Sequence, residues 1–455
     1  MRKLTTAAAA AAAGIALALS GCSAGSGQDA DVAPAKSGTV SWWGYTPDTP
    51  VAQRYIAEFN KEYPKIKVTY RNFENVDYRQ AIIPALDSGK GPDIFDTSAA
   101  GGTPAQYGPY AIDLTSFAKQ TLGADWKSKI GANYADQLTD DGQLTAMPLG
   151  GQAAGMLWWN KDILDKAGAS VPTDYASWVD TCKKITAVGK ACFTMGAGGK
   201  DTFPTELYHS IANSVDPTWF LKAATGKAKW TDPQGIETLD IIKRMKADGI
   251  IAKNVLDGGQ YPLADGQFQK SEAASVQMGF WYTQYSGAQS CKTAEESAGV
   301  SNPTCFVQVP SAFPDVAGKG NGSAYFGEVD YGLSINADSK NVGAAKTFVR
   351  WMTMSKTGQQ NVANALDLLP SLQGVQPDWS DITLVDQAVQ QPAIEKLITA
   401  SGSTTQTRQY QTTEKTLDGI VVAIQQILDP TVDKPTQQIA SDLQGASEAS
   451  TVGTK

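Results

Sequence analysis

The sequence predicts an α/β protein built on a parallel β-sheet, and three observations support this class. β-Prone runs occur at 39–43, 66–70 and 93–95. Helical stretches separate these runs, one beginning near Pro50 and one at about 76–87. Strands that alternate with helices in this order pair in parallel through right-handed crossovers.

The first helix is justified by its start and by its periodicity. Asp48 is a residue type that favours the N-cap position, and Pro50 suits the first helical turn. Val51, Tyr55 and Phe59 then recur every four residues, which places them on one apolar face.

The second strand is indicated by period two, because Ile66, Val68 and Tyr70 alternate with polar residues. The carboxyl ends of the first and third strands fall at 43–45 and 96–98, and open parallel sheets bind ligands beyond such ends. No Gly-x-Gly-x-x-Gly follows the first strand, so a dinucleotide site is not supported.

Three later helices are predicted from apolar residues at helical spacing. Asp232-Pro233 begins the first of them, and Gly249 is the expected C-terminal stop. The core-facing stripes are Ile236, Leu239, Ile242 and Met245; Val342, Ala345, Val349 and Met352; and Leu417, Ile420, Ile424 and Ile427.

Composition bounds the possible functions. The 455 residues allow about three domains or two large lobes. Lys and Arg number 38 against 46 Asp and Glu, an acidic balance that argues against a nucleic-acid partner. One histidine, His209, and five cysteines leave little material for a metal site, and no cofactor motif is present. We expect His209 to be a packed or surface residue.

The chain begins like an exported protein. Arg2 and Lys3 precede the uncharged, Ala-rich stretch 4–20, which is typical of a secretory signal. Leu19-Ser20-Gly21-Cys22 resembles the bacterial lipobox, in which the cysteine is acylated and becomes the mature N-terminus. We therefore interpret 1–21 as a lipoprotein signal peptide and 22–38 as a flexible tether that lipid at Cys22 holds to the membrane. A plain signal peptide or an uncleaved anchor helix are the alternatives.

The remaining four cysteines indicate disulfide bonds, which exported proteins form readily. They fall into two local sets, Cys182 with Cys192 and Cys291 with Cys305, and local pairing is the first choice among three possible pairings. Buried free thiols are the alternative. Zinc ligation is disfavoured because no Cys-x-x-Cys spacing occurs.

Five segments resemble the bacterial extracellular solute-binding proteins of carbohydrate ABC importers, the group that includes maltose-binding proteins. They follow the family order over nearly the whole mature chain, although the 278–281 element is one residue shorter than usual. Two further departures are Trp158-Trp159 in place of two tyrosines and a cysteine-bearing insertion around 291–305. The segments are Gly91–Ile94, Met147–Gly151 with Leu157–Asp162, Met278–Trp281, Tyr331–Met352 and Leu369–Ser371.

The resemblance implies a periplasmic-binding-protein-like fold of two α/β lobes joined by a hinge that the chain crosses three times. We expect crossings near Gly150, Val309 and Ile335, with Gly150-Gly151 and Gly332 as hinge positions because glycine absorbs φ/ψ changes. The expected segments are 39–149 plus 310–335 for the N-terminal lobe, 150–309 plus 336–444 for the C-terminal lobe, and 445–455 for a frayed tail.

Sugar pockets combine aromatic rings, which stack on the C–H faces of pyranoses, with a few polar groups for the hydroxyls. The resemblance places a stacking tryptophan at Trp281, while Trp42 is expected to face the core. The predicted ligand-binding residues are Trp43, Tyr45, Asp96, Gln152, Trp281, Tyr282, Tyr325 and Glu328.

The predicted function is capture of a sugar or oligosaccharide between the lobes of a monomer and its delivery to the permease subunits of an ABC importer. The location would be extracytoplasmic, with Cys22 as membrane anchor. The alternatives are a ligand-sensing lipoprotein of the same fold and a secreted carbohydrate-active enzyme. No spacing nominates a glycosidase pair, and the Gly-x-Ser-x-Gly match at 21–25 lies at the cleavage point, so no catalytic residue is proposed.

Overall fold

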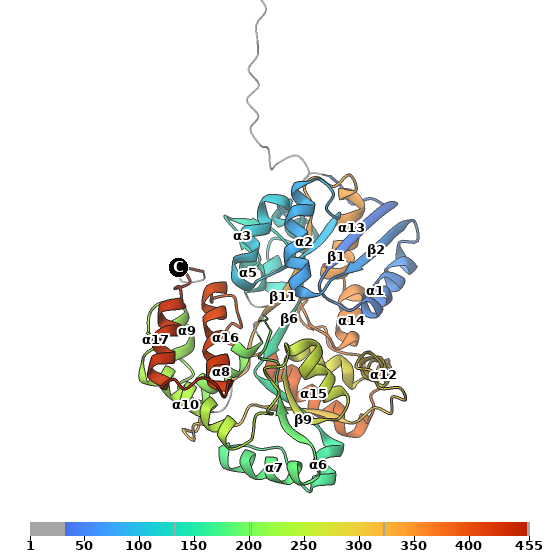
Figure 1. Ribbon diagram of the computed structural model, residues 1–455. Coiled ribbons are helices and arrows are strands. Elements are labelled where there is room, and N and C mark those ends of the chain that lie inside the picture. The colour runs from blue at the N-terminus through green and yellow to red at the C-terminus, as the bar shows by residue number, and fades with distance from the viewer. Residues whose placement is uncertain (1–31, 132, 200, 202, 322–323, 453–455) are drawn as a thin grey trace, which may run out of the picture.

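The computed structural model describes residues 32–131, 133–199, 201, 203–321 and 324–452, which form the two lobes of Figure 1. The predicted signal segment and Cys22 lie outside the described residues. Within these ranges no helix is long and apolar enough to cross a membrane.

The N-terminal lobe is built on a six-stranded sheet with the order β12-β6-β11-β3-β1-β2. β1 pairs in parallel with β2 and β3, whereas β11 is antiparallel to β3 and β6, so the sheet is mixed rather than purely parallel. The strands are β1 (Gly38–Gly44), β2 (Ile66–Asn72), β3 (Ile94–Ser98), β6 (Met147–Ala154), β11 (Phe326–Ile335) and β12 (Leu369–Pro370).

Helices cover both faces of this sheet (Figure 1). They are α1 (Thr49–Glu62), α2 (Asn75–Asp87), α3 (Thr103–Tyr107), α4 (Thr115–Leu122), α5 (Tyr134–Gln137), α13 (Val342–Met354) and α14 (Lys356–Ala365). Smaller elements are the 3-10 turns η1 (Ala100–Gly102), η2 (Gly108–Tyr110) and η3 (Trp126–Lys129) and the hairpin of β4 (Thr139–Asp140) and β5 (Gln143–Leu144).

The C-terminal lobe has a four-stranded sheet with the order β10-β7-β9-β8. Its strands are β7 (Met156–Asn160), β8 (Ala191–Thr194), β9 (Ala273–Met278) and β10 (Gln308–Ala312). Its helices are α6 (Lys161–Ala167), α7 (Tyr175–Ala187), α8 (Pro204–Val215), α9 (Trp219–Ala224), α10 (Pro233–Ala247), α11 (Asp265–Gln269), α12 (Ala288–Ser297), α15 (Gln387–Ser401), α16 (Glu414–Leu428) and α17 (Thr436–Ala446). The π-turn η4 (Gln260–Ala264) precedes α11, and the 3-10 turn η5 (Phe280–Ser286) follows β9.

Each lobe has its own core, and the predicted helix faces point into them. Trp42 is fully buried between Tyr70 and Phe348 in the N-terminal lobe, which confirms that it faces the core. Ile420, Ile424 and Ile427 are buried in the C-terminal core, while Leu417, the first residue of that stripe, lines the cavity between the lobes. The stripe at 342–352 is buried in the N-terminal core. Full burial of each such apolar side chain stabilises the folded state by roughly 1.5–3 kcal/mol.

The hinge crossings differ from the expected ones. The chain leaves β6 and enters β7 at Gly155, which has φ +89°, while Gly150 lies inside β6 and pairs with Tyr331. A Cβ at Gly150 would lie 2.8 Å from the Leu369 carbonyl oxygen, so close packing explains that glycine. Gly332 is likewise inside a strand, β11.

The second and third hinge crossings can also be compared with the predicted positions. The second crossing runs from β10 to β11, after Val309. The predicted third crossing near Ile335 is wrong, because α13 and α14 pack on the N-terminal core and β12 joins that lobe's sheet. The chain returns between Leu372, which bridges to Ile130, and Leu384, which bridges to Gly287.

Both ends of the described chain form hydrogen bonds with the lobes. The predicted tether is bound from residue 32 onward, since Ala35 N–H donates to Gly343 at 2.8 Å and the Lys346 ammonium donates to the Val32 carbonyl. The tail was expected to be frayed from residue 445. Instead, Ser450 N–H donates to Ala224 at 2.9 Å, so the tail packs on the C-terminal lobe.

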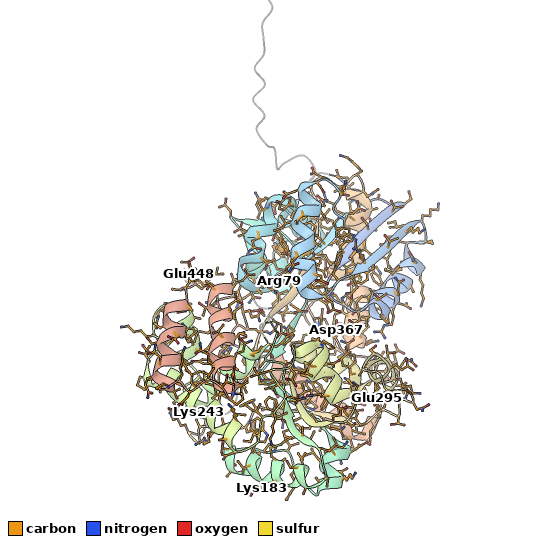
Figure 2. All side chains as sticks on the ribbon, in the orientation of Figure 1. Arg79, Lys183, Lys243, Glu295, Asp367 and Glu448 are labelled. Carbon is orange, nitrogen blue, oxygen red and sulfur yellow. A yellow bond between two sulfur atoms is a disulfide. The ribbon has the colours of Figure 1, made fainter. Side chains whose placement is uncertain are left out.

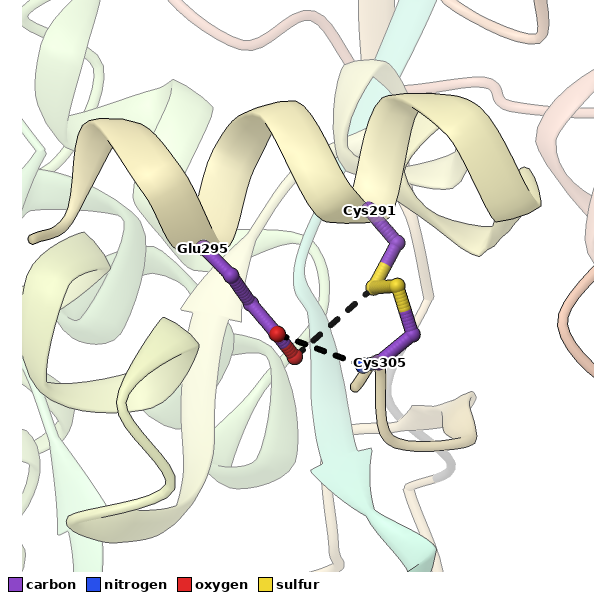
Figure 3. Close-up of side chains that lie close together, drawn as sticks. All are labelled: Cys291, Glu295 and Cys305. Carbon is purple, nitrogen blue, oxygen red and sulfur yellow. Dashed lines mark hydrogen bonds between the residues drawn. A yellow bond between two sulfur atoms is a disulfide. The ribbon is translucent and has the colours of Figure 1, made fainter. Parts of the chain in front are cut away.

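Both local disulfides predicted from spacing are present. Cys182–Cys192 joins α7 to β8, and Cys291–Cys305 joins α12 to the segment before β10. Figure 3 shows the buried carboxylate of Glu295 beside the second bond, where its Oε2 accepts the N–H groups of Thr304 and Cys305 at 2.9 and 3.2 Å. Because both sulfurs are joined to each other, this cluster holds no thiolate for a metal in the oxidised protein.

Candidate functional site

A cavity of about 950 Å³ lies between the lobes. The N-terminal lobe contributes α2, α3 and the ends of β1 and β3, the C-terminal lobe contributes α16, and β11 forms the floor. The polar and aromatic lining residues include Tyr45, Tyr78, Arg79, Ser98, Thr103, Gln106, Tyr107, Glu328, Asp330, Arg408, Gln409, Glu414 and Asp418. This position matches the rule that ligands bind beyond the carboxyl ends of parallel strands.

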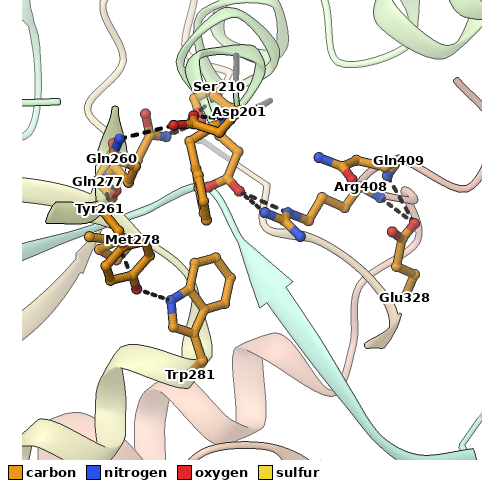
Figure 4. Close-up of polar contacts among 12 residues, drawn as sticks. Asp201, Ser210, Gln260, Tyr261, Gln277, Met278, Trp281, Glu328, Arg408 and Gln409 are labelled. Atoms are coloured by element: carbon orange, nitrogen blue, oxygen red, sulfur yellow. Dashed lines mark hydrogen bonds and ion pairs between the residues drawn. The ribbon is translucent and has the colours of Figure 1, made fainter. Parts of the chain in front are cut away.

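Arg408 connects the floor of the cavity to the C-terminal lobe (Figure 4). Glu328 Oε2 accepts the N–H groups of Arg408, Gln409 and Tyr410 at 3.1, 2.9 and 2.8 Å. The Arg408 guanidinium donates from Nε to Glu206 Oε1 on α8 at 2.8 Å. Burial raises the pKa of both Glu206 and Glu328, against the opposing effects of Arg408 and these hydrogen bonds.

Three aromatic side chains stand beside Arg408 and form what we call the aromatic wall: Phe203, Tyr261 and Trp281. The Trp281 indole N–H donates to the Tyr261 hydroxyl at 3.0 Å, and the Phe203 ring centroid lies 5.9 Å from that of Trp281. The Arg408 guanidinium carbon is 5.1 Å from the Trp281 ring centroid (Figure 4). Tyr261 is 39% exposed, so this wall is open to an incoming ring.

Outside the cavity floor, a few polar contacts among the described residues cross between the lobes, one of them the ion pair of Arg79 with Glu414 at 3.5 Å. The Tyr285 hydroxyl donates to Asp48 at 3.4 Å, and Gln284 Nε2 donates to Asp367 at 3.0 Å. Asp48, expected to cap α1, therefore faces the other lobe and makes no side-chain cap. Arg79 and Asp367 lie where the lobes meet (Figure 2).

The predicted site residues separate into three groups. Tyr45 and Glu328 line the cavity, and Trp281 belongs to the aromatic wall. Trp43 and Tyr325 are half-buried and lie outside the cavity lining, and the Trp43 ring is tilted by 50° against that of Phe73.

Three predicted residues are buried and do not line the cavity. Tyr282 is fully buried and its hydroxyl donates to Asp265 at 2.7 Å, so it presents no surface to the cavity in this structure. Asp96 is also fully buried and accepts the Trp42 indole N–H at 2.8 Å, which turns it toward the core. Gln152 is 3% exposed and does not line the cavity itself, but its side chain is hydrogen-bonded to Asp330, which does.

The sequence reasoning missed several residues that line the cavity. Tyr78 and Arg79 lie in the helix predicted at 76–87 but were not named as site residues, and Tyr107 ends the short helix α3, which was not predicted. Arg408 has no motif around it, since its partners Glu206 and Glu328 are 202 and 80 residues away.

Two α/β lobes around one polar cavity define a two-lobed ligand-binding fold. The chain belongs to the bacterial extracellular solute-binding protein family, whose sequence description matches residues 27–359.

Named relatives are similar at low identity. The multiple sugar-binding protein of Streptococcus mutans is 23% identical over 322 residues, 68% of this chain and 69% of that protein. A probable sugar-binding periplasmic protein of Brucella suis is 24% identical over 194 residues, 40% of this chain and 45% of that protein.

Solved structures share the fold. A protein from a study of xylan utilization by Caldanaerobius polysaccharolyticus aligns with a TM-score of 0.69 and 21% identity, covering 90% of this chain and 99% of that one. The GacH receptor of Streptomyces glaucescens aligns with a TM-score of 0.67 and 20% identity, covering 90% and 97% of the two chains.

Proposed function

We propose that this chain is an extracytoplasmic, monomeric binding protein that captures a sugar or oligosaccharide between its lobes and delivers it to the permease subunits of an ABC importer. The observation that carries the proposal is the cavity between the lobes, with the aromatic wall beside it. A pyranose presents C–H faces to aromatic rings and hydroxyls to carboxylates, amides and backbone groups, and the cavity and wall supply these partners.

Closure of the lobes would couple binding to transport. A ligand that touches β11 and α2 on one side and α16 on the other gains contacts when the lobes approach. It shifts the open-to-closed equilibrium by its difference in affinity for the two states. The small number of polar contacts across the boundary, such as Tyr285 to Asp48, leaves little to oppose this movement.

A panel of sugars in a thermal-shift assay tests the proposal directly. A ligand that binds only the folded chain raises its stability by about 2.7 kcal/mol at 100 times the dissociation constant. Absence of any shift with mono-, di- and oligosaccharides would contradict a sugar ligand.

Trp281→Ala is expected to weaken binding of a sugar found in that panel by about 2 kcal/mol, the loss typical of an aromatic anchor. This corresponds to a dissociation constant raised roughly thirtyfold. Isothermal titration calorimetry measures the change, and Trp379→Ala, a half-buried tryptophan far from the cavity lining, is the matched control. Unchanged affinity with a stability loss of about 3–5 kcal/mol would show that Trp281 is a packing residue.

The proposal includes a lipid anchor at Cys22. Cys22→Ala is expected to block processing or to release the protein from the membrane fraction, whereas Ser23→Ala should leave both unchanged. Intact mass spectrometry of the mature protein reports the modification. An unlipidated N-terminus at another residue would contradict the anchor.

A further inference from the structure

The floor of the cavity carries two acidic side chains on the same strand. Glu328 and Asp330 of β11 both line the cavity, while Val329 and Tyr331 are buried in the N-terminal core. The pairing of β11 with β6 is irregular at this point, since its register shifts between Val329 and Tyr331, and both carboxylates nevertheless reach the cavity lining.

The two carboxylates differ in the groups that compensate their negative charge. Glu328 accepts three backbone N–H groups from the segment 408–410. Asp330 is half-buried and hydrogen-bonded to the Gln152 side chain, and within the described residues it forms no ion pair. Burial raises the pKa of its carboxyl group to about 6, against the opposing effect of Arg408, and the carboxylate is therefore still mostly ionised at pH 7.

The cations that line the cavity are already engaged. Arg79 pairs with Glu414 across the lobe boundary at 3.5 Å. Arg408 is held by Glu206, 2.8 Å from Nε to Oε1. Carboxylates outnumber cations in the cavity lining, and Asp330 at its floor is close enough to Arg408 for the guanidinium to lower its pKa but forms no ion pair with it.

We propose that Asp330 makes this cavity select its sugar ligands by charge: sugars that carry an amine bind most tightly, neutral sugars bind less tightly, and sugars that carry a carboxylate are rejected. The inference rests on the proposed function, because it assumes that the cavity holds a carbohydrate. An ammonium group forms a charge-assisted hydrogen bond with the Asp330 carboxylate, which is roughly twice as strong as a bond between neutral groups. A ligand carboxylate would instead lie next to the negative charge of Asp330 at a partly desolvated position. Such a like-charge contact costs free energy and therefore weakens binding of acidic sugars.

Calorimetric titrations at pH 7 with four trisaccharides test the proposal: maltotriose and cellotriose as neutral probes, the glucosamine trimer as the amine, and trigalacturonate as the acid. We expect the glucosamine trimer to bind about tenfold more tightly than the better neutral trimer, and trigalacturonate to give no measurable binding. Asp330→Asn should bring the glucosamine trimer to within about threefold of that neutral trimer, and Asp330→Glu should keep the wild-type order.

Asp381→Asn is the matched control, since it removes one exposed negative charge away from the cavity lining and should leave the ratios unchanged. Binding of trigalacturonate as tight as that of the neutral trimers, or unchanged selectivity in Asp330→Asn, would overturn the inference while leaving the proposed function intact. Failure of all four trimers to bind the wild-type protein would instead count against both.

Discussion

Glu206→Ala is expected to lower the free energy of unfolding by about 3–5 kcal/mol, because it leaves the buried Arg408 guanidinium without its partner. The side chains of Glu206 and Arg408 are only 2% and 14% exposed, so water replaces little of the lost interaction. Urea unfolding followed by tryptophan fluorescence measures the change.

A surface ion pair provides the matched control for Glu206→Ala. Glu237 pairs with Lys319, and their side chains are 38% and 41% exposed. Exposed pairs are worth about 0–1 kcal/mol, so Glu237→Ala should cost no more than that. Replacing both members of the buried pair, as Glu206→Met with Arg408→Met, should recover much of the loss. If Glu206→Ala and Glu237→Ala lower the free energy of unfolding equally, Glu206 is not needed to compensate the charge of Arg408. Glu328 or Asp330 would then be sufficient.

Acidification is expected to destabilise the protein through its single histidine. His209 is 1% exposed, and its ring stacks between Phe220 and Phe326 at centroid distances of 3.9 and 4.0 Å. Burial lowers the pKa of His209 to about 3, against the opposing hydrogen bond with Gln406. The unfolded chain, with a histidine pKa near 6.5, therefore binds a proton between pH 6.5 and 3 that the folded chain does not.

The sign follows from this difference in proton binding. The stability associated with neutral His209 is fully present above pH 6.5 and is lost as the pH falls toward 3. At 1.36 kcal/mol per pH unit, the loss is about 2 kcal/mol at pH 5 and about 5 kcal/mol at pH 3. His209→Phe keeps a planar ring but cannot ionise, so its stability should fall less between pH 7 and 5 by about 2 kcal/mol.

The same prediction has a spectroscopic check. Since His209 is the one histidine in the sequence, its imidazole NMR signals are unambiguous, and they should not titrate between pH 8 and 5. A midpoint near 6.5, or equal pH dependence of stability in wild type and His209→Phe, would contradict the buried neutral ring.

Helices, strands and disulfides could be predicted because their signals are local. Val51, Tyr55 and Phe59 define the buried face of α1 through spacing alone. The two disulfides close over separations of 10 and 14 residues, so proximity along the chain favoured the observed pairing. The ordered segments also led to the correct family.

The orientation of adjacent side chains could not be predicted in the same way. Trp281 and Tyr282 are neighbours in η5, yet one stands in the aromatic wall and the other is buried against Trp158. A 3-10 turn has no two-residue or four-residue period that marks its outer face. The packing of β7 and α11 against this turn decides that the Tyr282 ring is covered.

The sequence by itself determined the α/β class, the family, the local elements and both disulfides, because periodicity and short spacings act over a few residues. The tertiary structure alone decided which lobe holds α13 and α14, and which polar groups meet at the cavity. Arg408 meets Glu206 across 202 residues and Glu328 across 80. Contacts at such separations depend on how both lobes pack, and burial then decides which charges are paired and which, like Asp330, face the ligand space.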